Sequence, residues 1–244
     1  MTRRENCPTQ NPACVDRGSI VYRNRTPDST GPALFTIGCS NGALDELFAE
    51  IRRFGINALA DVRSTPYSAY TPQFNRENLA EACRKEGVAY VYLGDEFGAM
   101  RTKPEPMSDG TVSAPVTDGI VDFIKVRQTE AFRRGVERVS RGLAKGLRIA
   151  LMCTELEPER CHRAVMVSPA FVDRCPIGHV TRDGEIMSHG DLEKRLLAQG
   201  GPYQDSLFEE TALEQAYKNA NLRIGVKIGK KESKHRSKDD YGRF

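Results

Sequence analysis

The sequence predicts an α/β fold: a single domain with a mostly parallel sheet and helices on both faces. Two observations support this prediction. Short apolar segments alternate along the chain with longer segments in which apolar residues recur at helical spacing. The central short segments are apolar along their whole length, which is typical of strands that are buried on both faces, as in parallel sheets.

The first half of the predicted sheet contains three strands and two helices. Ser40 is a suitable cap for the first helix. Gly55 and Gly87 end the two helices, because glycine readily adopts the left-handed conformation that closes a helix. In chain order, the elements are a strand over residues 33–38, a helix over 44–54, a strand over 56–62, a helix over 75–86 and a strand over 88–93.

The second half begins with a long connection over residues 94–118. It contains prolines and an Asp-Gly pair, and loops of this length inside a compact domain are usually functional or mobile. Gly146 ends the next helix, and Asp183-Gly184 forms the turn of a hairpin. The elements are a helix over residues 130–145, a strand over 147–153, a helix over 159–171, a hairpin over 179–187 and a helix over 191–199.

Composition and charge divide the chain into four parts. Residues 1–32 contain four prolines and are predicted to be irregular. The α/β domain spans residues 33–200, and a C-terminal extension spans residues 201–222. Residues 223–244 carry eight basic and three acidic side chains, so this predicted disordered tail has a charge of +5, whereas the whole chain has a charge of +3.

The composition also indicates the compartment. No segment approaches the ~20 apolar residues of a membrane helix. The N-terminal residues are polar and are not followed by the apolar stretch of a secretory signal. We therefore expect a cytoplasmic protein with no membrane partner. Its seven cysteines are then expected to be reduced, which argues against a disulfide scaffold.

Polar side chains follow the second predicted strand, at the edge where open α/β sheets bind their ligands. Asp61 ends this strand, and Arg63 and Ser64 come directly after it. A buried aspartate needs partners, so Asp61 and Arg63 either form a structural pair or belong to a site in which Arg63 and Ser64 bind an anion such as phosphate. Further candidates for substrate binding are Asn41 and three aromatic side chains that could stack on a base or sugar, namely Tyr67, Tyr70 and Phe74.

A second cluster follows the fourth predicted strand. A helix beginning near Glu159 would place Cys161 and His162 in its first turn. The partial positive charge of the helix and the nearby Arg163 would lower the pKa of the thiol there. Cys161 is therefore a candidate nucleophile or metal ligand, and Glu155 or His162 is a candidate proton-transfer group. The alternative is a buried, inert cysteine.

A metal site is chemically permissible in the same cluster. Cys153, Cys161 and His162 could bind zinc or iron, with Cys39 or Glu155 as a fourth ligand. However, the spacing C-x7-C-H is not one of the usual zinc patterns. Adjacent residues on a helix also point in different directions, which weighs against two neighbouring ligands.

Four motifs along the chain resemble one protein family. They are Thr36-Ile37-Gly38-Cys39-Ser40-Asn41, Asp61-Val62-Arg63-Ser64-x-Pro66, Pro72-Gln73-Phe74-Asn75 and Met152-Cys153-x-Glu155-x2-Pro158-x2-Cys161-His162-Arg163. Together they resemble the bacterial and archaeal family named domain of unknown function 488, over about residues 33–208. The resemblance implies an α/β fold and one site built from these motifs, but no activity. The family usually has histidine where this chain has Cys39, and cysteine could replace a histidine ligand better than a histidine base.

The C-terminal region contains two signals for partners. Gln204-Asp205-Ser206-Leu207-Phe208 resembles the pentapeptide by which bacterial replication and repair proteins dock on the sliding clamp. In that interaction Gln204 would bond at the rim of a pocket, and Leu207 and Phe208 would fill an apolar groove. The alternative is that these residues pack on the protein's own core. The basic tail is typical of sequence-independent binding to nucleic acid, or of a solvated disordered segment.

These observations lead to three functional hypotheses. The first is an enzyme that acts on a nucleotide or nucleic acid, in DNA repair or in base or nucleoside modification. The second is a non-catalytic adaptor that binds nucleic acid or the sliding clamp, and the third is a metal- or sulfur-dependent cysteine enzyme. The candidate catalytic residues are Cys161, His162, Glu155 and Asp61, and the candidate substrate-binding residues are Arg63, Ser64, Arg163, Asn41, Tyr67, Tyr70 and Phe74.

Overall fold

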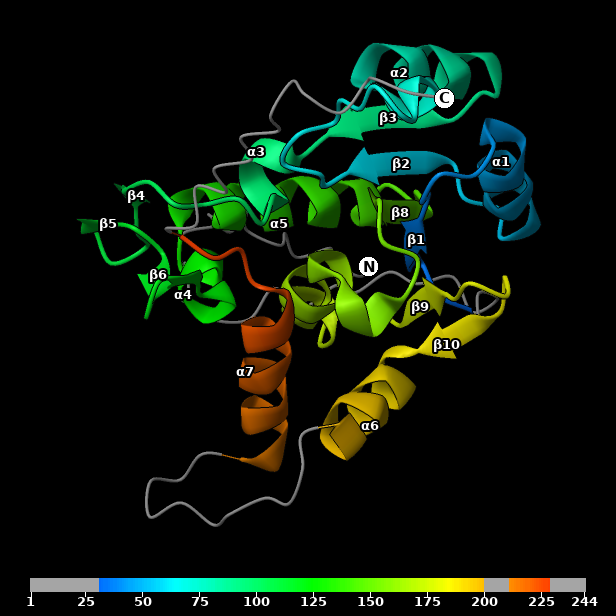
Figure 1. The fold of residues 1–244 in the computed structure, drawn as a ribbon. Helices are drawn as coiled ribbons and strands as arrows, with labels where there is room; N and C mark the ends of the chain where they lie inside the picture. Colours follow the sequence, from blue (N-terminus) through cyan, green and yellow to red (C-terminus); the bar gives the residue numbers. More distant parts are fainter. Residues whose placement is uncertain (1–30, 200–210, 229–244) are drawn as a thin grey trace, which may run out of the picture.

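The computed structural model describes residues 31–199 and 211–228, and six of its strands form one sheet (Figure 1). The strands are β1 (Leu34–Gly38), β2 (Ala58–Asp61), β3 (Ala89–Tyr92), β8 (Ile149–Cys153), β9 (Ile177–Val180) and β10 (Ile186–Ser188). Their order in the sheet is β10-β9-β1-β8-β2-β3. All neighbours from β9 to β3 are parallel, and β10 runs antiparallel to β9. The predicted α/β fold with a mostly parallel sheet is therefore confirmed.

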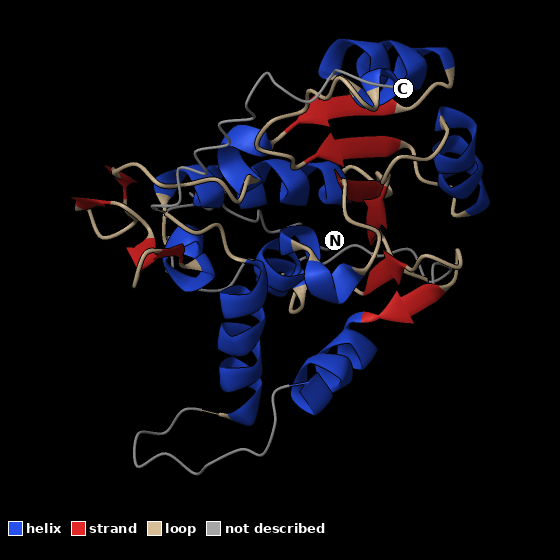
Figure 2. Ribbon diagram, in the orientation of Figure 1, coloured by secondary structure: helices blue, strands red, loops and turns tan. Residues whose placement is uncertain are grey.

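Helices cover both faces of this sheet (Figure 2). Successive residues of a strand point to opposite faces, so Leu34 packs in one core and Phe35 in the other. The core around Phe35 includes buried residues of the helices α1 (Leu44–Arg53) and α2 (Arg76–Lys85). The core around Leu34 includes residues of α5 (Glu130–Ala144) and of the segment 158–171.

The predicted long connection after β3 contains short elements. They are α3 (Gly94–Phe97), the hairpin of β4 (Glu105–Pro106) and β5 (Val112–Ser113), the hairpin of β6 (Val116–Thr117) and β7 (Ile120–Val121), and then α4 (Phe123–Arg127). Phe97 of α3 packs edge-on against Phe132 of α5, with ring centroids 5.0 Å apart. This contact anchors the start of the connection in the core.

The segment 158–171 differs from the regular helix that its sequence predicts. It consists of a 3₁₀ turn over Pro158–Arg160, a π-helical turn over Arg163–Val167 and a second 3₁₀ turn over Ser168–Phe171. Pro169 has no N–H to continue an α-helical ladder, and the Ser168 hydroxyl donates to the Arg163 carbonyl, 3.0 Å away. The prolines and this side-chain bond explain why the regular helix does not form.

Two helices follow the hairpin of β9 and β10. The predicted last helix is α6 (His189–Gln199), and the sequence pattern did not predict α7 (Ala212–Ile224), which packs against it. Beyond α7, the Val226 carbonyl accepts a hydrogen bond of 2.9 Å from the Val121 N–H. The first residues of the predicted disordered tail, 223–228, therefore belong to α7 and to an extended segment beside β7.

Several predictions fall outside the described residues. They concern the irregular segment up to residue 30, the clamp-like Gln204–Phe208 and the tail from residue 229 onward. Within the described ranges, no helix is both long and apolar enough to cross a membrane.

Candidate functional site

The candidate site lies where the connections of the sheet change face. The chain leaves β1 for α1 on one face, and it leaves the neighbouring strand β8 for the segment 158–171 on the other. Open α/β sheets bind ligands in the crevice at such a switch point, beyond the carboxyl ends of the strands. A cavity of about 310 Å³ opens here, lined by Ser40, Ala99, Cys153, Thr154, Glu155, Arg160, Cys161, His162 and Ile224.

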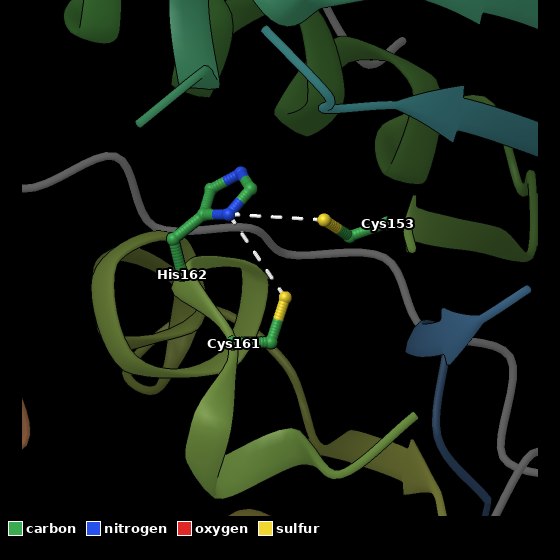
Figure 3. Close-up of side chains that lie close together, drawn as sticks. All are labelled: Cys153, Cys161 and His162. Atoms are coloured by element: carbon green, nitrogen blue, oxygen red, sulfur yellow. Dashed lines mark hydrogen bonds between the residues drawn. The ribbon is translucent and has the colours of Figure 1, made fainter. Parts of the chain in front are cut away.

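Three candidate metal ligands converge beside this cavity (Figure 3). The Nδ1 atom of His162 lies 3.8 Å from the sulfur of Cys153 and 3.9 Å from the sulfur of Cys161. All three atoms lie within 4.8 Å of one another, and both thiols are buried. The structure thus brings together three of the five residues that the sequence indicated as candidate metal ligands.

The backbone explains how two adjacent residues point at one place. Cys161 is extended, with φ −132° and ψ 138°, and His162 is the first residue with helical angles. The Cys161 carbonyl accepts from the N–H groups of Ala164 and Val165, so Cys161 precedes the helical segment. The prediction that Cys161 lies within the first helical turn is therefore wrong, and so is the objection that its side chain must diverge from that of His162.

The second ring nitrogen of His162 fixes the tautomer. Its Nε2 atom lies 3.0 Å from the carbonyl oxygen of Val62, the residue after β2. A carbonyl oxygen can only accept, so Nε2 carries the hydrogen and Nδ1 of the neutral ring has a free lone pair. That lone pair belongs to the nitrogen nearest the two sulfurs. A metal-binding histidine usually has this second hydrogen bond, which orients the ring and increases its basicity.

A buried positive charge lies beside the thiols. The Arg163 side chain is fully buried and donates to the carbonyls of Glu155 and Leu156. In the described parts of the chain no carboxylate lies within 4.0 Å of its guanidinium nitrogens, so its charge acts on the cysteines instead. Both terminal nitrogens of Arg163 are thus engaged by its own backbone, whereas its buried Nε has no hydrogen-bond partner among the described residues, and its role in binding a substrate anion stays a prediction.

The two thiols differ in their ionisation. Burial by itself raises the pKa of Cys161, but the hydrogen bond from Cys153 and the charge of Arg163 outweigh burial and hold this pKa well below its ordinary value. The same hydrogen bond and burial raise the pKa of Cys153 well above its ordinary value. Cys161 is therefore the stronger acid of the pair and Cys153 the weaker one.

The loop after β1 separates two cavities. A Cβ atom on Gly38 would lie 2.3 Å from the Glu155 carbonyl oxygen, so only glycine allows β1 to end against this backbone. Ser40 lines both the site cavity and a second one of about 520 Å³, and its φ of 42° is unusual for a residue with a side chain.

Two other candidates near β1 lie away from the site cavity. The exposed Asn41 lines the second cavity and does not line the site cavity. Cys39 is buried in the core on the other face, where burial raises its pKa to about 11, so it does not join the metal ligands.

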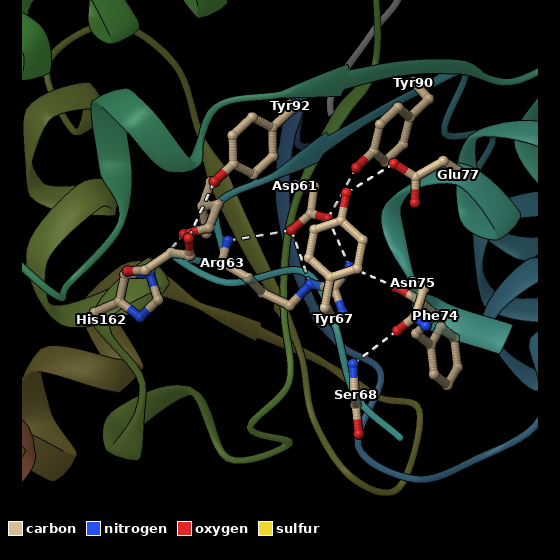
Figure 4. Close-up of polar contacts among 12 residues, drawn as sticks. Asp61, Arg63, Tyr67, Ser68, Phe74, Asn75, Glu77, Tyr90, Tyr92 and His162 are labelled. Atoms are coloured by element: carbon tan, nitrogen blue, oxygen red, sulfur yellow. Dashed lines mark hydrogen bonds and ion pairs between the residues drawn. The ribbon is translucent and has the colours of Figure 1, made fainter. Parts of the chain in front are cut away.

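The Asp61 carboxylate after β2 is saturated by contacts within the protein (Figure 4). The buried Asp61 carboxylate accepts from the Arg63 backbone N–H, Nε and Nη2 at 3.1, 2.9 and 2.6 Å, and from the Tyr90 hydroxyl at 2.9 Å. Arg63 Nη2 also donates to the Phe74 carbonyl at 2.7 Å. The Ser64 hydroxyl accepts from the Met100 N–H at 3.0 Å. These contacts favour the structural role of the Asp61–Arg63 pair over anion binding.

The three aromatic candidates fall in different places. Phe74 is 1% exposed in the core with α1 and α2, so it cannot stack on a base and that prediction is corrected. The Tyr67 hydroxyl donates to Glu77, 2.7 Å away, and its ring is half exposed (Figure 4). Tyr70 is 97% exposed. None of the three lines the site cavity.

Two charged side chains remain at the cavity. Glu155 is exposed, and its carboxylate accepts from the Leu156 N–H at 3.1 Å. Arg160 is exposed, and no described residue forms a salt bridge with it. The sequence predicted Glu155 as a site residue. It did not predict that Arg160 and Ile224 line the cavity or that the Val62 carbonyl bonds to His162. These three residues come from separate segments, and their spacing along the chain does not indicate that they meet.

Comparison with known proteins identifies a family. The model of a domain of unknown function, DUF488, matches residues 43–168, which is more than half of the chain and contains Asp61, Cys153, Cys161 and His162. No curated protein and no solved structure matches the chain. The matched part covers α1 to the π-helical turn, so the candidate site lies largely within it. The chain therefore belongs to the DUF488 family.

Proposed function

We propose that Cys153, Cys161 and His162 bind a zinc ion and that this chain is a zinc-dependent enzyme. One observation carries the proposal: Nε2 of His162 is engaged by the Val62 carbonyl, which leaves Nδ1 as the nitrogen that faces two buried sulfurs. Imidazole nitrogen and thiolate sulfur are preferred ligands of zinc. The same three donors serve iron less specifically, so zinc is the metal we propose.

The spacing of the donors supports this metal. Zinc–sulfur bonds of about 2.3 Å and zinc–nitrogen bonds of about 2.0–2.1 Å at tetrahedral angles place sulfur and nitrogen about 3.5 Å apart. The observed distances from Nδ1 are 3.8 and 3.9 Å. A contraction of a few tenths of an ångström would therefore bring each sulfur to the required distance from the nitrogen. The two sulfurs, which lie within 4.8 Å of each other, would have to be about 3.8 Å apart.

The number of ligands favours catalysis over a structural role. Structural zinc sites usually have four protein ligands, whereas catalytic sites have three and keep one position for water or substrate. Here three ligands border a cavity of about 310 Å³. Zinc in such a site lowers the pKa of its bound water to about 7 and so supplies a nucleophile at neutral pH.

The remaining groups of the cavity fit a hydrolytic reaction. Glu155 is the proposed proton-transfer group, and Arg160 is the proposed partner of an anionic part of the substrate. One histidine and two cysteines beside a glutamate also bind zinc in nucleobase deaminases, although the order of the residues differs there. This precedent concerns ligand chemistry and not fold. It keeps a nucleotide or nucleic acid as the proposed substrate class.

Elemental analysis of the anaerobically purified protein tests the proposal. We expect about one zinc per chain, lost in the variant Cys161→Ala. The matched control is Cys83→Ala, which removes a buried thiol from the core around α2 and is expected to keep the metal. Both variants should retain the circular dichroism of the parent.

The same samples distinguish the rival hypotheses through titration of their thiols. A protein without metal but with one fast-reacting thiol, absent from Cys161→Ala, would overturn the zinc proposal in favour of Cys161 as a nucleophile. A protein with neither metal nor reactive thiol would exclude both cysteine mechanisms and favour the adaptor hypothesis.

A further inference from the structure

A continuous chain of hydrogen bonds connects the sheet with α6 and α7. It begins at Thr36 on β1 and passes through His179 on β9 to the first residue of α6, His189. It then reaches Tyr217 on α7 and ends at Glu193 on α6. The four links measure 2.9 Å from Thr36 Oγ1 to His179 Nδ1, 3.0 Å from His179 Nε2 to His189 Nδ1, 3.0 Å from His189 Nε2 to the Tyr217 hydroxyl, and 3.0 Å from that hydroxyl to Glu193 Oε1.

The chain has one consistent direction when both histidines are neutral. The Glu193 carboxylate only accepts, so the Tyr217 hydroxyl donates to it and accepts from His189 Nε2. Nδ1 of the neutral His189 then carries no hydrogen and accepts from His179 Nε2. By the same reasoning His179 Nδ1 accepts from the Thr36 hydroxyl. Every donor and acceptor of the two rings is used. A proton added at His189 Nδ1 would face the N–H of His179 Nε2, so two donors would meet there, whereas a proton added at His179 Nδ1 would require the Thr36 hydroxyl to turn and accept.

The surroundings also favour neutral rings. His179 is fully buried, and His189 is 8% exposed. Burial, the neighbouring ring and the charge of Arg163 hold the pKa of His179 well below its ordinary value. Burial lowers the pKa of His189 too, and the Glu193 carboxylate opposes this shift without cancelling it. The other charged group that faces the chain is Arg127 of α4, which acts on Tyr217.

The helices held by this chain also border the candidate site. Ile224, the last residue of α7, lines the cavity beside Cys161 and His162. α7 packs against the 3₁₀ turn and the π-helical turn on either side of these two residues. Figure 1 shows α6 and α7 extending together from one side of the molecule. Movement of α7 would therefore open a wall of the cavity.

We propose that the chain from Thr36 to Glu193 is an acid-sensitive lock, which holds α6 and α7 on the sheet while His179 and His189 are neutral and releases them when the two rings take up protons. The lock does not depend on zinc binding, so it stands or falls separately from the proposed function.

The expected size of the effect follows from the titration of histidine. A histidine freed by opening has an ordinary pKa of about 6.5, whereas in the locked state its pKa is lower. The open state therefore binds more protons, so the lock is at full strength above about pH 6.5 and weakens as the pH falls. Between pH 7.5 and 5.5, opening should increase by up to about tenfold for each histidine and by up to about a hundredfold for both, and His179, whose pKa is lowered further, should contribute more.

Hydrogen–deuterium exchange of the full chain at these two pH values tests the lock, after correction for the intrinsic pH dependence of exchange. The opening equilibrium of residues 189–199 and 212–224 should increase by about tenfold to a hundredfold at pH 5.5. β8 serves as the reference and should change far less. Equal changes in β8 and the two helices would indicate general acid destabilisation, and unchanged helices would show no lock; either result overturns the proposal.

Substitutions of the histidines and of Tyr217 show which side chains cause the pH response of α6 and α7. His189→Gln should reduce the pH response of the helices to about tenfold, and the double variant with His179→Gln should nearly abolish it. Tyr217→Phe keeps the aromatic ring but removes the hydroxyl that bonds to His189 and Glu193. It should increase the opening equilibrium of α6 and α7 several-fold already at pH 7.5. Its matched control is Tyr70→Phe at a 97% exposed position. Should the histidine variants fail to fold, a Tyr217→Phe protein that opens no more than Tyr70→Phe would still contradict the proposal.

Discussion

The ends of β2 and β8 carry two polar clusters of opposite character. After β2, every hydrogen-bonding atom of the Asp61 carboxylate is engaged by Arg63 or Tyr90. After β8, the sulfurs of Cys153 and Cys161 and Nδ1 of His162 converge on one place. The comparison teaches that saturation by the protein's own groups distinguishes a structural cluster from one that can still bind a ligand.

The largest expected effect is on metal affinity at the end of β8. Cys161→Ala should weaken zinc binding by well over a hundredfold, because loss of a mere hydrogen-bond partner of a ligand already costs 10–100-fold. Competition with a chromophoric chelator measures this affinity. The control is Asp61→Asn, which should leave zinc affinity unchanged if the β2 cluster is structural. Equal losses in both variants would break the distinction between the clusters.

The next largest effect is on folding at the end of β2. Asp61→Ala leaves the guanidinium of Arg63 buried without its carboxylate, which should lower the free energy of unfolding by about 3–5 kcal/mol. Urea denaturation measures the loss. Glu81→Ala removes the exposed partner of Arg84 and should leave the free energy of unfolding nearly unchanged, because solvent screens this pair. A small loss for Asp61→Ala would show that the saturated cluster is not the structural element we describe.

A smaller effect is expected on ligand binding when the exposed arginine at the site cavity is replaced. Arg160→Gln should weaken binding of adenosine monophosphate to the zinc-loaded protein about tenfold and leave stability unchanged, since Arg160 is exposed and lines the cavity. Arg52→Gln on α1, in an exposed pair with Glu86, is the control. Calorimetric titration measures both. An unchanged affinity in Arg160→Gln would remove this side chain from the site.

The smallest effect concerns one bond at the edge of the β2 cluster. Tyr90→Phe removes the hydroxyl that donates to Asp61, while three donors from Arg63 remain. We expect a loss of about 1 kcal/mol in the free energy of unfolding and no change in zinc content. A loss as large as that of Asp61→Ala would mean that the carboxylate depends on Tyr90 rather than Arg63.

The sequence predicted the sheet well because its strands are apolar throughout and glycines mark the helix ends. The predicted hairpin and the helices α1, α2, α5 and α6 are confirmed. α7 escaped prediction because the residues that it buries are mostly alanine, such as Ala216 and Ala220, which give a weak apolar stripe. The irregular segment 158–171 was missed because the effect of Pro169 and of the Ser168 hydroxyl on the helix depends on local backbone geometry.

The candidate site was predictable in part. Strand order and the general binding edge of α/β sheets indicated Cys153, Cys161 and His162, and the structure brings them together. The convergence of Cys161 and His162 could not be predicted, because it depends on an extended residue directly before a helical one. The Val62 carbonyl that bonds to His162 lies directly after another strand, β2, and backbone acceptors leave no mark in a sequence.

The central claim is the ligand set of the proposed zinc ion, and X-ray absorption at the zinc edge of the purified protein tests it most directly. The account predicts two sulfur atoms at about 2.3 Å and two nitrogen or oxygen atoms at about 2.0–2.1 Å, the histidine and a water. The histidine should add the outer-shell scattering of an imidazole ring. Coordination by nitrogen and oxygen alone, or by four sulfur atoms, would contradict the account.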